Sequence, residues 1–228
     1  GHDIVQGIAN MEERGNGLGG GFAAYGCYPN HADCYAFHVM YTEPDSKPQV
    51  ESFLRDNFVL VFDEEVPHQT TPDIAAPPLI WRYFLRVDEN GEECALQGER
   101  EYLVGKVMKV NTAGQGAYIY GSGKNVGVFK GVGHPEQIAC YFGVEEYTGY
   151  LWTAHARFPT NTPGWWGGAH PFSVLDWTVV HNGEISSYGA NRRYLEMQGY
   201  HCTMHTDTEV IAYAADFLMR RHNLPVEV

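Results

Sequence analysis

Residues 151–184 constrain the fold of this chain more tightly than any other stretch. They cover most of two apolar runs, residues 150–158 and 174–181, which are rich in Trp, Val, Leu, Phe and Thr. Side chains of these types favour β-strands. A turn signal follows each run, first at residues 159–164 and then at Asn182-Gly183. The stretch therefore predicts two strands that each end in a turn.

Polar side chains gather at the ends of these predicted strands and in the turns after them. They are His155, Arg157, Thr160, Asn161, His170, Asn182 and Gly183. An arginine presents a planar fork that pairs with a carboxylate, and an Asn-Gly pair offers an amide and an unhindered backbone N–H to a developing oxyanion. Two interpretations stay open from spacing alone: a site at the edge of a sheet, or a β-hairpin with an Asn-Gly turn and a solvated arginine.

Composition excludes several classes of protein. The 228 residues include 15 Lys and Arg against 28 Asp and Glu, so the formal net charge is −13, which argues against a nucleic-acid partner. No apolar run approaches the roughly 20 residues of a membrane span, and the first residues lack the basic and apolar regions of a signal peptide. The five cysteines form an odd, widely spaced set, which favours reduced thiols in a cytoplasmic protein over a disulfide framework.

Periodicity in the rest of the chain predicts a mixture of helices and antiparallel strands. Helices are expected over residues 2–14, 46–57, 99–111, 135–143, 192–198 and 207–222. Strands are expected over residues 19–25, 58–62, 79–87, 117–120 and 126–130, with a hairpin-type turn at residues 88–91. This mixture indicates an α+β fold and not a doubly wound sheet.

Two groupings of histidine and cysteine invite comparison with metal sites, but neither has the spacing that zinc prefers. They are Cys27, His31 and Cys34, and His201, Cys202 and His205. The glycine-rich residues 15–21 lack the Lys-Ser/Thr pair and the preceding strand of a phosphate loop. We therefore expect no metal and no nucleotide phosphate in this chain.

Four short motifs, HARFPTNTPG, AHPF, VVHNGEI and TDTEVIA, occur in this order along the chain. Together they resemble the class II glutamine amidotransferases, which are N-terminal-nucleophile hydrolases. The run HNGEISSYGANRRYLEMQGY is most similar to the amidotransferase domain of glutamate synthase, especially its stand-alone archaeal type. The resemblance covers nearly the whole chain, so we expect a single domain over residues 1–228. It implies a four-layer α/β/β/α sandwich of two mainly antiparallel sheets.

The resemblance also implies a role for each residue that matches a motif. Arg157 would bind the α-carboxylate of glutamine, Thr160 would shape the same corner, and His170 would support the pocket wall. Asn182 and the backbone N–H of Gly183 would form the oxyanion hole. These roles suit the chemistry, because neutral donors face the oxyanion and a cation faces the carboxylate.

A second set of expectations concerns the motif TDTE and the tryptophan pair. Asp207 would hold the α-amino group of glutamine, although the helix dipole alone also explains a carboxylate in the first turn of a helix. Thr206 and Glu209 have the spacing of a capping box. Trp165 and Trp166 would belong to the loop over the glutamine site, or to the core.

The catalytic cysteine of the family is the mature N-terminal residue, whereas this chain begins Gly-His-Asp. None of the internal cysteines can replace it, because none carries a free α-amine; they are Cys27, Cys34, Cys94, Cys140 and Cys202. The resemblance thus implies a chain that lacks the nucleophile strand and part of the C-terminus. We expect such a chain to be inactive by itself.

Two classes of function follow from these motifs. The first is the glutaminase part of a glutamate synthase, with no cofactor of its own, passing ammonia to a synthase partner that carries FMN and an iron–sulfur cluster. The second is a catalytically inactive domain that binds glutamine or assembles with the synthase. The amidotransferases of aminosugar, purine and asparagine synthesis share the motifs and remain an alternative within the first class.

Overall fold

The computed structural model describes residues 1–88, 91–158, 164–225 and 227. The α-helices are α1 (His2–Ala9), α2 (Lys47–Asn57), α3 (Glu92–Gln97), α4 (Glu99–Thr112), α5 (Pro135–Phe142), α6 (Tyr188–Met197) and α7 (Asp207–Asp216). The strands are β1 (Gly20–Tyr25), β2 (Tyr35–Tyr41), β3 (Val59–Glu65), β4 (Leu79–Arg86), β5 (Ala117–Gly121), β6 (Val126–Gly131), β7 (Leu151–Ala156), β8 (Phe172–Val174) and β9 (Trp177–Val179). Among these helices, none is both long and apolar enough to cross a membrane.

The strands form two main sheets and a short hairpin. One sheet has the order β6-β1-β7, the other has the order β3-β4-β2-β5, and β8 pairs with β9. Every pairing between these strands is antiparallel. The α+β class with mainly antiparallel sheets, predicted from the sequence, is therefore confirmed.

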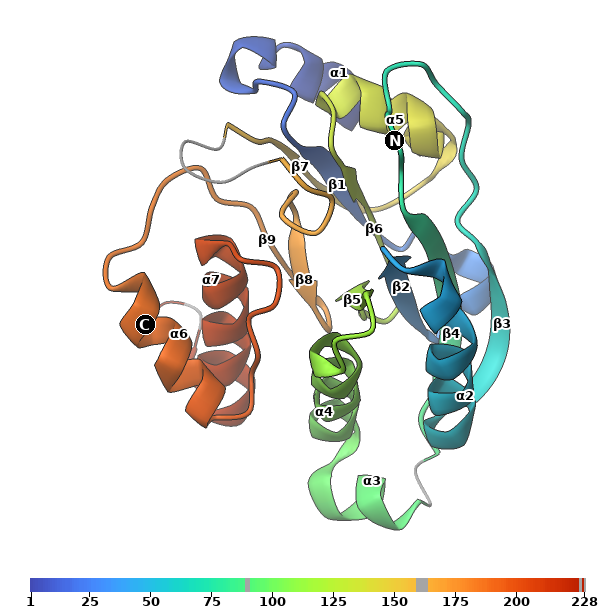
Figure 1. Cartoon of the computed structure of the whole chain (residues 1–228), viewed down its shortest axis with the longest axis vertical. Coiled ribbons are helices and arrows are strands. Elements are labelled where there is room, and N and C mark those ends of the chain that lie inside the picture. The colour runs from blue at the N-terminus through green and yellow to red at the C-terminus, as the bar shows by residue number, and fades with distance from the viewer. Residues whose placement is uncertain (89–90, 159–163, 226, 228) are drawn as a thin grey trace.

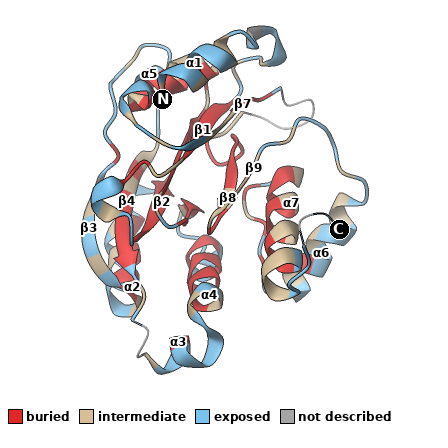
Figure 2. Ribbon diagram, turned by 180° about the vertical axis from the view of Figure 1, so that it is seen from behind, coloured by how far each residue is buried: buried red, intermediate tan, exposed pale blue. Residues whose placement is uncertain are grey.

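The two main sheets lie face to face, with helices on both outer sides (Figure 1). The odd-numbered residues of β2, such as Phe37 and Val39, pack with the buried side chains of α2 and α4. The even-numbered Ala36 and Met40 pack instead with β1, β6, α1 and α5. Alternation along one strand thus separates two hydrophobic cores, and all seven residues of β2 are buried (Figure 2). The order of the layers is the α/β/β/α order expected from the resemblance.

The second apolar run, residues 174–181, is not one strand as predicted. It contains the end of β8 and all of β9, and the chain reverses at Leu175, which has a φ of +49°. Leu175 is fully buried in the core, and the carboxylate of Asp176 accepts the backbone N–H of Lys124 at 3.0 Å. Apolar composition alone could not reveal this reversal, because the turn residue is itself a core side chain.

Three further boundaries differ from the prediction. Helix α3 follows β4, where the sequence predicted a hairpin-type turn, and residues 89 and 90 of that turn lie outside the described residues. Helix α6 begins at Tyr188, and Ser187 occupies the position that we predicted for Asn191. Helix α1 ends at Ala9, and a separate 3-10 turn, Glu12–Arg14, covers the end of the predicted helix. The other predicted helices and strands are present within a few residues of their expected ends.

Candidate active site

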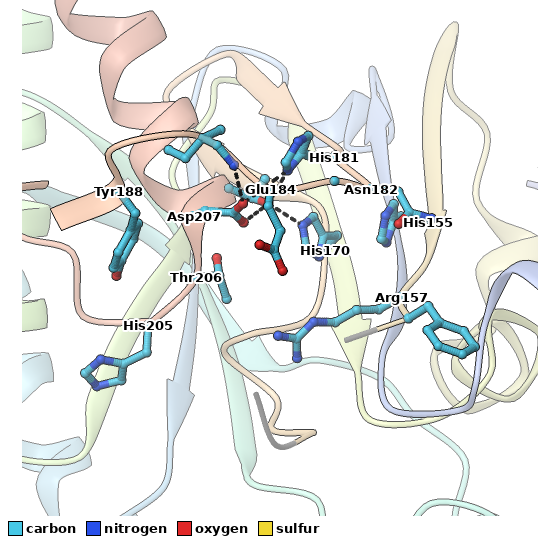
Figure 3. A pocket seen from close by; sticks show the side chains of 14 residues that line it. His155, Arg157, His170, His181, Asn182, Glu184, Tyr188, His205, Thr206 and Asp207 are labelled. Carbon is cyan, nitrogen blue, oxygen red and sulfur yellow. Dashed lines mark hydrogen bonds and ion pairs between the residues drawn. The ribbon is translucent and has the colours of Figure 1, made fainter. Parts of the chain in front are cut away.

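A pocket of about 370 Å³ lies where β7, the segment after β9 and the start of α7 meet (Figure 3). Its walls come from four separate stretches within residues 155–208. The lining residues are His155, Arg157, Phe158, His170, His181, Asn182, Gly183, Glu184, Ile185, Tyr188, His205, Thr206, Asp207 and Thr208.

The structure brings most of the predicted site residues into this pocket. Arg157, His170, Asn182, Gly183 and Asp207 all line it. Thr160 and Asn161 lie outside the described residues. The individual roles of these side chains stay predictions, but their shared location is a property of the fold.

Arg157 follows β7 directly and is held between two glycines. Its backbone N–H donates to the carbonyl of Gly19 at 2.9 Å. A Cβ at Gly19 would lie 3.1 Å from Cδ of Arg157, and a Cβ at Gly168 would lie 3.1 Å from Nη1. The glycine-rich segments around residues 19 and 168 therefore make room for a buried guanidinium. Burial lowers the pKa of Arg157, and the charge of Asp207 acts in the opposite direction.

Asp207 is the first residue of α7, where the helix dipole favours a carboxylate. Its Oδ2 atom accepts the backbone N–H of Ile185 at 3.2 Å and lies 3.7 Å from Nδ1 of His181. The hydroxyl of Thr206 accepts the N–H of Glu209 at 3.3 Å, so half of the predicted capping box is present. Asp207 thereby faces both the pocket and the segment that carries Asn182.

A pair of neutral imidazoles forms one wall of the pocket. The rings of His155 and His170 stack with centroids 4.2 Å apart, and Nε2 of His170 lies 2.7 Å from Oγ1 of Thr208. Burial lowers the pKa of His170 to about 2, with further contributions from the neighbouring His155, Lys130 and Arg157. Burial likewise lowers the pKa of His155 to about 4. Both imidazoles are therefore uncharged at neutral pH, and His170 makes a hydrogen bond with Thr208.

Asn182 and Gly183 lie in the exposed segment between β9 and α6. Neither residue has a positive φ, so the Asn-Gly pair is not the tight hairpin turn that was one of the two interpretations of the sequence. Both residues instead line the pocket. Donors of this kind can stabilise a negative oxygen that develops in the cavity.

No cysteine is found among the pocket-lining residues that the structure describes. Four of the thiols, those of Cys27, Cys34, Cys94 and Cys202, are buried elsewhere, and Cys140 is exposed on α5. The amino group of Gly1 donates to the carbonyl of Tyr147 at 2.7 Å and does not border the pocket. The described side chains can thus bind and polarise a ligand, but they supply no thiol to attack it.

Neither tryptophan of the pair is among the residues that line the pocket. Trp166 is buried in the core against Tyr141 and Phe142, and Trp165 packs edge-on against Tyr118. Within the part of the chain that the structure describes, no group of three or more His, Cys, Asp or Glu side chains could hold a metal ion.

Sequence reasoning missed several residues of the pocket. His181, Glu184, Tyr188, His205, Thr206 and Thr208 line it but were not assigned to the site. Four of them lie within the motifs named above: His181 and Glu184 in VVHNGEI, and Thr206 and Thr208 in TDTEVIA. Tyr188 and His205 depend on how α6 and the segment before α7 fold against the pocket, which no local pattern reveals.

The fold and this site define an α+β domain with an amidotransferase-type pocket. The family model described as "Glutamine amidotransferases class-II" matches residues 58–214. This match covers more than half of the sequence, and the chain belongs to the class II glutamine amidotransferases.

Three relatives show how the similarity is distributed. An uncharacterized protein of Archaeoglobus fulgidus is 59% identical over 231 residues, covering 100% of this chain and 61% of that protein. The glutamine amidotransferase-like protein GlxB of Rhizobium meliloti is 37% identical, over 41% of this chain and 32% of its own length. The glutamine–fructose-6-phosphate aminotransferase (isomerizing) of Sulfurisphaera tokodaii is 33% identical, over 44% of this chain and 17% of its own length. The chain therefore spans about three fifths of the first relative and smaller fractions of the others.

Proposed function

We propose that the pocket binds glutamine and that the domain releases ammonia from its side-chain amide as the amidotransferase part of a glutamate synthase. The observation that carries the proposal is that Arg157 and Asp207 line the same cavity as Asn182 and Gly183. An arginine and an aspartate in one pocket match the carboxylate and ammonium of an amino acid. Placing both charges fixes the substrate, so that its side chain has one preferred direction.

In the proposed reaction a thiolate adds to the side-chain carbonyl carbon of glutamine. The carbonyl oxygen becomes an oxyanion and accepts hydrogen bonds from the amide of Asn182 and the backbone N–H of Gly183. Collapse of this intermediate, with proton transfer to the leaving nitrogen, releases ammonia and leaves a thioester. Water then hydrolyses the thioester to glutamate and regenerates the thiol. Arg157 and Asp207 hold the amino-acid end of the substrate throughout.

The proposal places the thiol on a residue outside the 228 residues of this chain. Strand β7 supports this placement, because among the described residues it pairs only with β1 and leaves its other edge open. His155 lies on this strand and Arg157 follows it directly, so a segment that pairs with the open edge reaches the pocket. An additional strand also satisfies the exposed backbone groups of the edge.

The assignment to glutamate synthase rests on the run of residues 181–200 and not on the relatives. We propose a synthase partner with FMN and an iron–sulfur cluster, and no cofactor in this domain. The similarity to glutamine–fructose-6-phosphate aminotransferase supports a second candidate, an amidotransferase of aminosugar synthesis. The two candidates differ in the acceptor of ammonia: a 2-oxo acid in the first and a sugar phosphate in the second.

The central experiment compares this chain with a longer form whose processing exposes an N-terminal cysteine. Glutamate release from glutamine is expected from the longer form alone, and a thiol-reactive glutamine analogue should block it by labelling the new terminus. Substantial turnover by the 228-residue chain would overturn the mechanism. Absence of turnover in both forms, together with tight glutamine binding, would favour the non-catalytic glutamine-binding domain.

Binding by the 228-residue chain tests the two charge contacts without any chemistry. Glutaramate lacks the α-amino group of glutamine, and 4-aminobutanamide lacks the α-carboxylate. Calorimetry should show that each analogue binds more weakly than glutamine by about 1–3 kcal/mol, the typical worth of a charge-assisted hydrogen bond. Equal affinity for glutamine and either analogue would exclude the corresponding contact.

A further inference from the structure

Backbone hydrogen bonds contribute little to holding the segment that carries Asn182 and Gly183. Strand β9 ends at Val179, and α6 begins at Tyr188. No backbone–backbone hydrogen bond joins residues 180–183 to another residue within the described ranges. Side-chain contacts must therefore fix the positions of the donors that form an oxyanion hole.

The first two residues of α7 supply such contacts on both sides of Asn182 and Gly183. Asp207 accepts the backbone N–H of Ile185 at 3.2 Å, after the pair, and lies 3.7 Å from Nδ1 of His181, before it. Oγ1 of Thr208 lies 3.5 Å from the same Nδ1 and 3.4 Å from Oδ1 of Asp207. Dashed lines in Figure 3 mark interactions at Asp207, His181 and His170.

The side chain of Thr208 is itself fixed by burial and by a hydrogen bond. Its side chain is almost fully buried, at 1% exposure, and its hydroxyl lies 2.7 Å from Nε2 of His170. His170 is buried and stacks on His155, so the imidazole that meets the hydroxyl has a fixed place. A β-branched side chain on a helix also has few rotamers. Thr208 therefore links a rigid wall of the pocket to the two groups that contact the Asn182 segment.

We propose that Thr208 is a positioning residue that holds the Asn182–Gly183 segment in the orientation needed for the oxyanion. The proposal rests on the proposed function, because it assigns Thr208 a task in the same reaction. Thr208 is at the pocket wall but only 1% exposed, and it acts through His181 and Asp207. Its loss should therefore reduce the stabilisation of the oxyanion more than the affinity for glutamine.

Two substitutions separate the hydroxyl from the bulk of the side chain. Thr208→Val keeps the shape and removes the hydroxyl, whereas Thr208→Ser keeps the hydroxyl and removes a methyl group. In the longer, processed protein, Thr208→Val should lower kcat for glutamate release about 10- to 100-fold, somewhat less than loss of an oxyanion donor itself. The KM for glutamine should change less than about threefold, and Thr208→Ser should recover most of kcat.

Thr178→Val is the matched control, because Thr178 belongs to β9 and its hydroxyl lies 2.8 Å from the hydroxyl of Tyr25, outside the pocket. It removes a comparable hydrogen bond from a threonine outside the pocket and should leave kcat unchanged. A normal kcat in Thr208→Val overturns the proposal. So does a loss of kcat that Thr208→Ser does not recover, or that Thr178→Val reproduces.

A second readout needs no catalysis and separates this proposal from the proposed function. In the 228-residue chain, Thr208→Val should shift or broaden the amide resonance of Gly183 and the ring nitrogen resonances of His181. If the longer, processed wild-type protein is inactive but these resonances change, the proposed function is refuted and Thr208 remains a positioning residue of the segment. If the longer, processed wild-type protein is active but Thr208→Val leaves the Gly183 and His181 resonances unaffected, the positioning role alone is refuted.

Discussion

The carboxylate of Glu209 accepts the backbone N–H of Met204 at 2.8 Å and that of Thr203 at 2.9 Å. The capping box predicted from the sequence placed this carboxylate on the N–H of Thr206 instead. Glu209 is buried, and burial raises its pKa to about 7, while the two backbone donors and the charge of Lys130 act in the opposite direction. Glu209, the third residue of α7, thus fixes the loop that leads into the pocket. Its role is not limited to capping its own helix.

Replacing Glu209 with Ala should destabilise the protein by about 3 kcal/mol, because two buried backbone donors lose their acceptor and buried Lys130 loses its nearby negative charge. Urea unfolding measures the change. Glu92→Ala is the matched control, since Glu92 is an exposed carboxylate in the first turn of α3, and it should change stability by less than about 0.5 kcal/mol. Similar losses in the two variants would contradict this role of Glu209.

Arg157→Lys should weaken the use of glutamine by about 1–3 kcal/mol in kcat/KM, because a lysine cannot form the two parallel hydrogen bonds of a guanidinium. The measurement is the kinetics of glutamate release by the longer, processed protein. Arg86→Lys is a suitable control, since Arg86 is half exposed and forms an ion pair with Asp33 away from the pocket. An unchanged kcat/KM in Arg157→Lys would exclude the carboxylate contact.

Asn182→Ala should lower kcat about 10²- to 10³-fold with little change in KM, as expected for the loss of one oxyanion donor. A residue that only shapes the segment would instead lower stability and leave the turnover of the folded protein near normal. Steady-state kinetics combined with thermal unfolding distinguishes the two outcomes. A change confined to KM would show that Asn182 binds the substrate in its ground state.

Asp207→Asn should nearly abolish glutamine binding, because the ammonium group loses its counter-charge. Asparagine keeps an oxygen for the N–H of Ile185, so the fold should persist with a stability loss of about 0.5 kcal/mol from the helix dipole. Asp3→Asn is the control, since Asp3 is an exposed carboxylate in the first turn of α1. Calorimetry that shows tight glutamine binding by folded Asp207→Asn would rule out the ammonium contact.

Acid should destabilise the protein through its buried histidines. Burial, with the charge of Arg82, lowers the pKa of His38 to about 3, and burial lowers those of His155 and His170 to about 4 and about 2. In the unfolded chain these groups titrate near pH 6.5. Between roughly pH 4 and 6.5 the unfolded state therefore binds more protons, so stability rises with pH in this window and falls on acidification.

His38→Gln tests this pH dependence without touching the pocket, because His38 lies between the sheets beside Tyr28. The substitution should reduce the slope of unfolding free energy against pH by up to about 1.4 kcal/mol per pH unit. Glu209 opposes the trend, since its raised pKa keeps a proton on the folded state below about pH 7. Urea unfolding between pH 4.5 and 6.5 with the same slope in both proteins would contradict a neutral, buried His38.

The sequence predicted the regular elements well where local patterns decide them. Pro135 at the start of α5 and Gly143 at its end lead directly to the observed boundaries. Strand β2, in contrast, was not predicted. The motif residues also converge on one pocket, because strand ends and the start of a helix hold them in defined directions. Arg157, Asn182 and Asp207 could therefore be grouped from their motifs alone.

Other features depend on contacts between segments that are distant in sequence, so local sequence patterns could not predict them. The reversal at Leu175 occurs inside an apolar run and is fixed by burial of Leu175 and by the contact of Asp176 with Lys124. The buried face of α7 includes two acidic residues, Glu209 and Asp216. Buried polar groups of this kind follow from tertiary partners, which a local pattern does not encode.

Strand β2 has neighbours on both edges, β4 and β5, and a hydrophobic core on each face. Local fluctuations that open a loop or a helix end do not expose a strand placed in this way. The backbone amides of β2 should consequently be the last in the molecule to exchange their hydrogens with deuterated solvent. Their exchange rates then report the free energy of complete unfolding, while amides of the segment between β9 and α6 exchange through small openings beside the pocket.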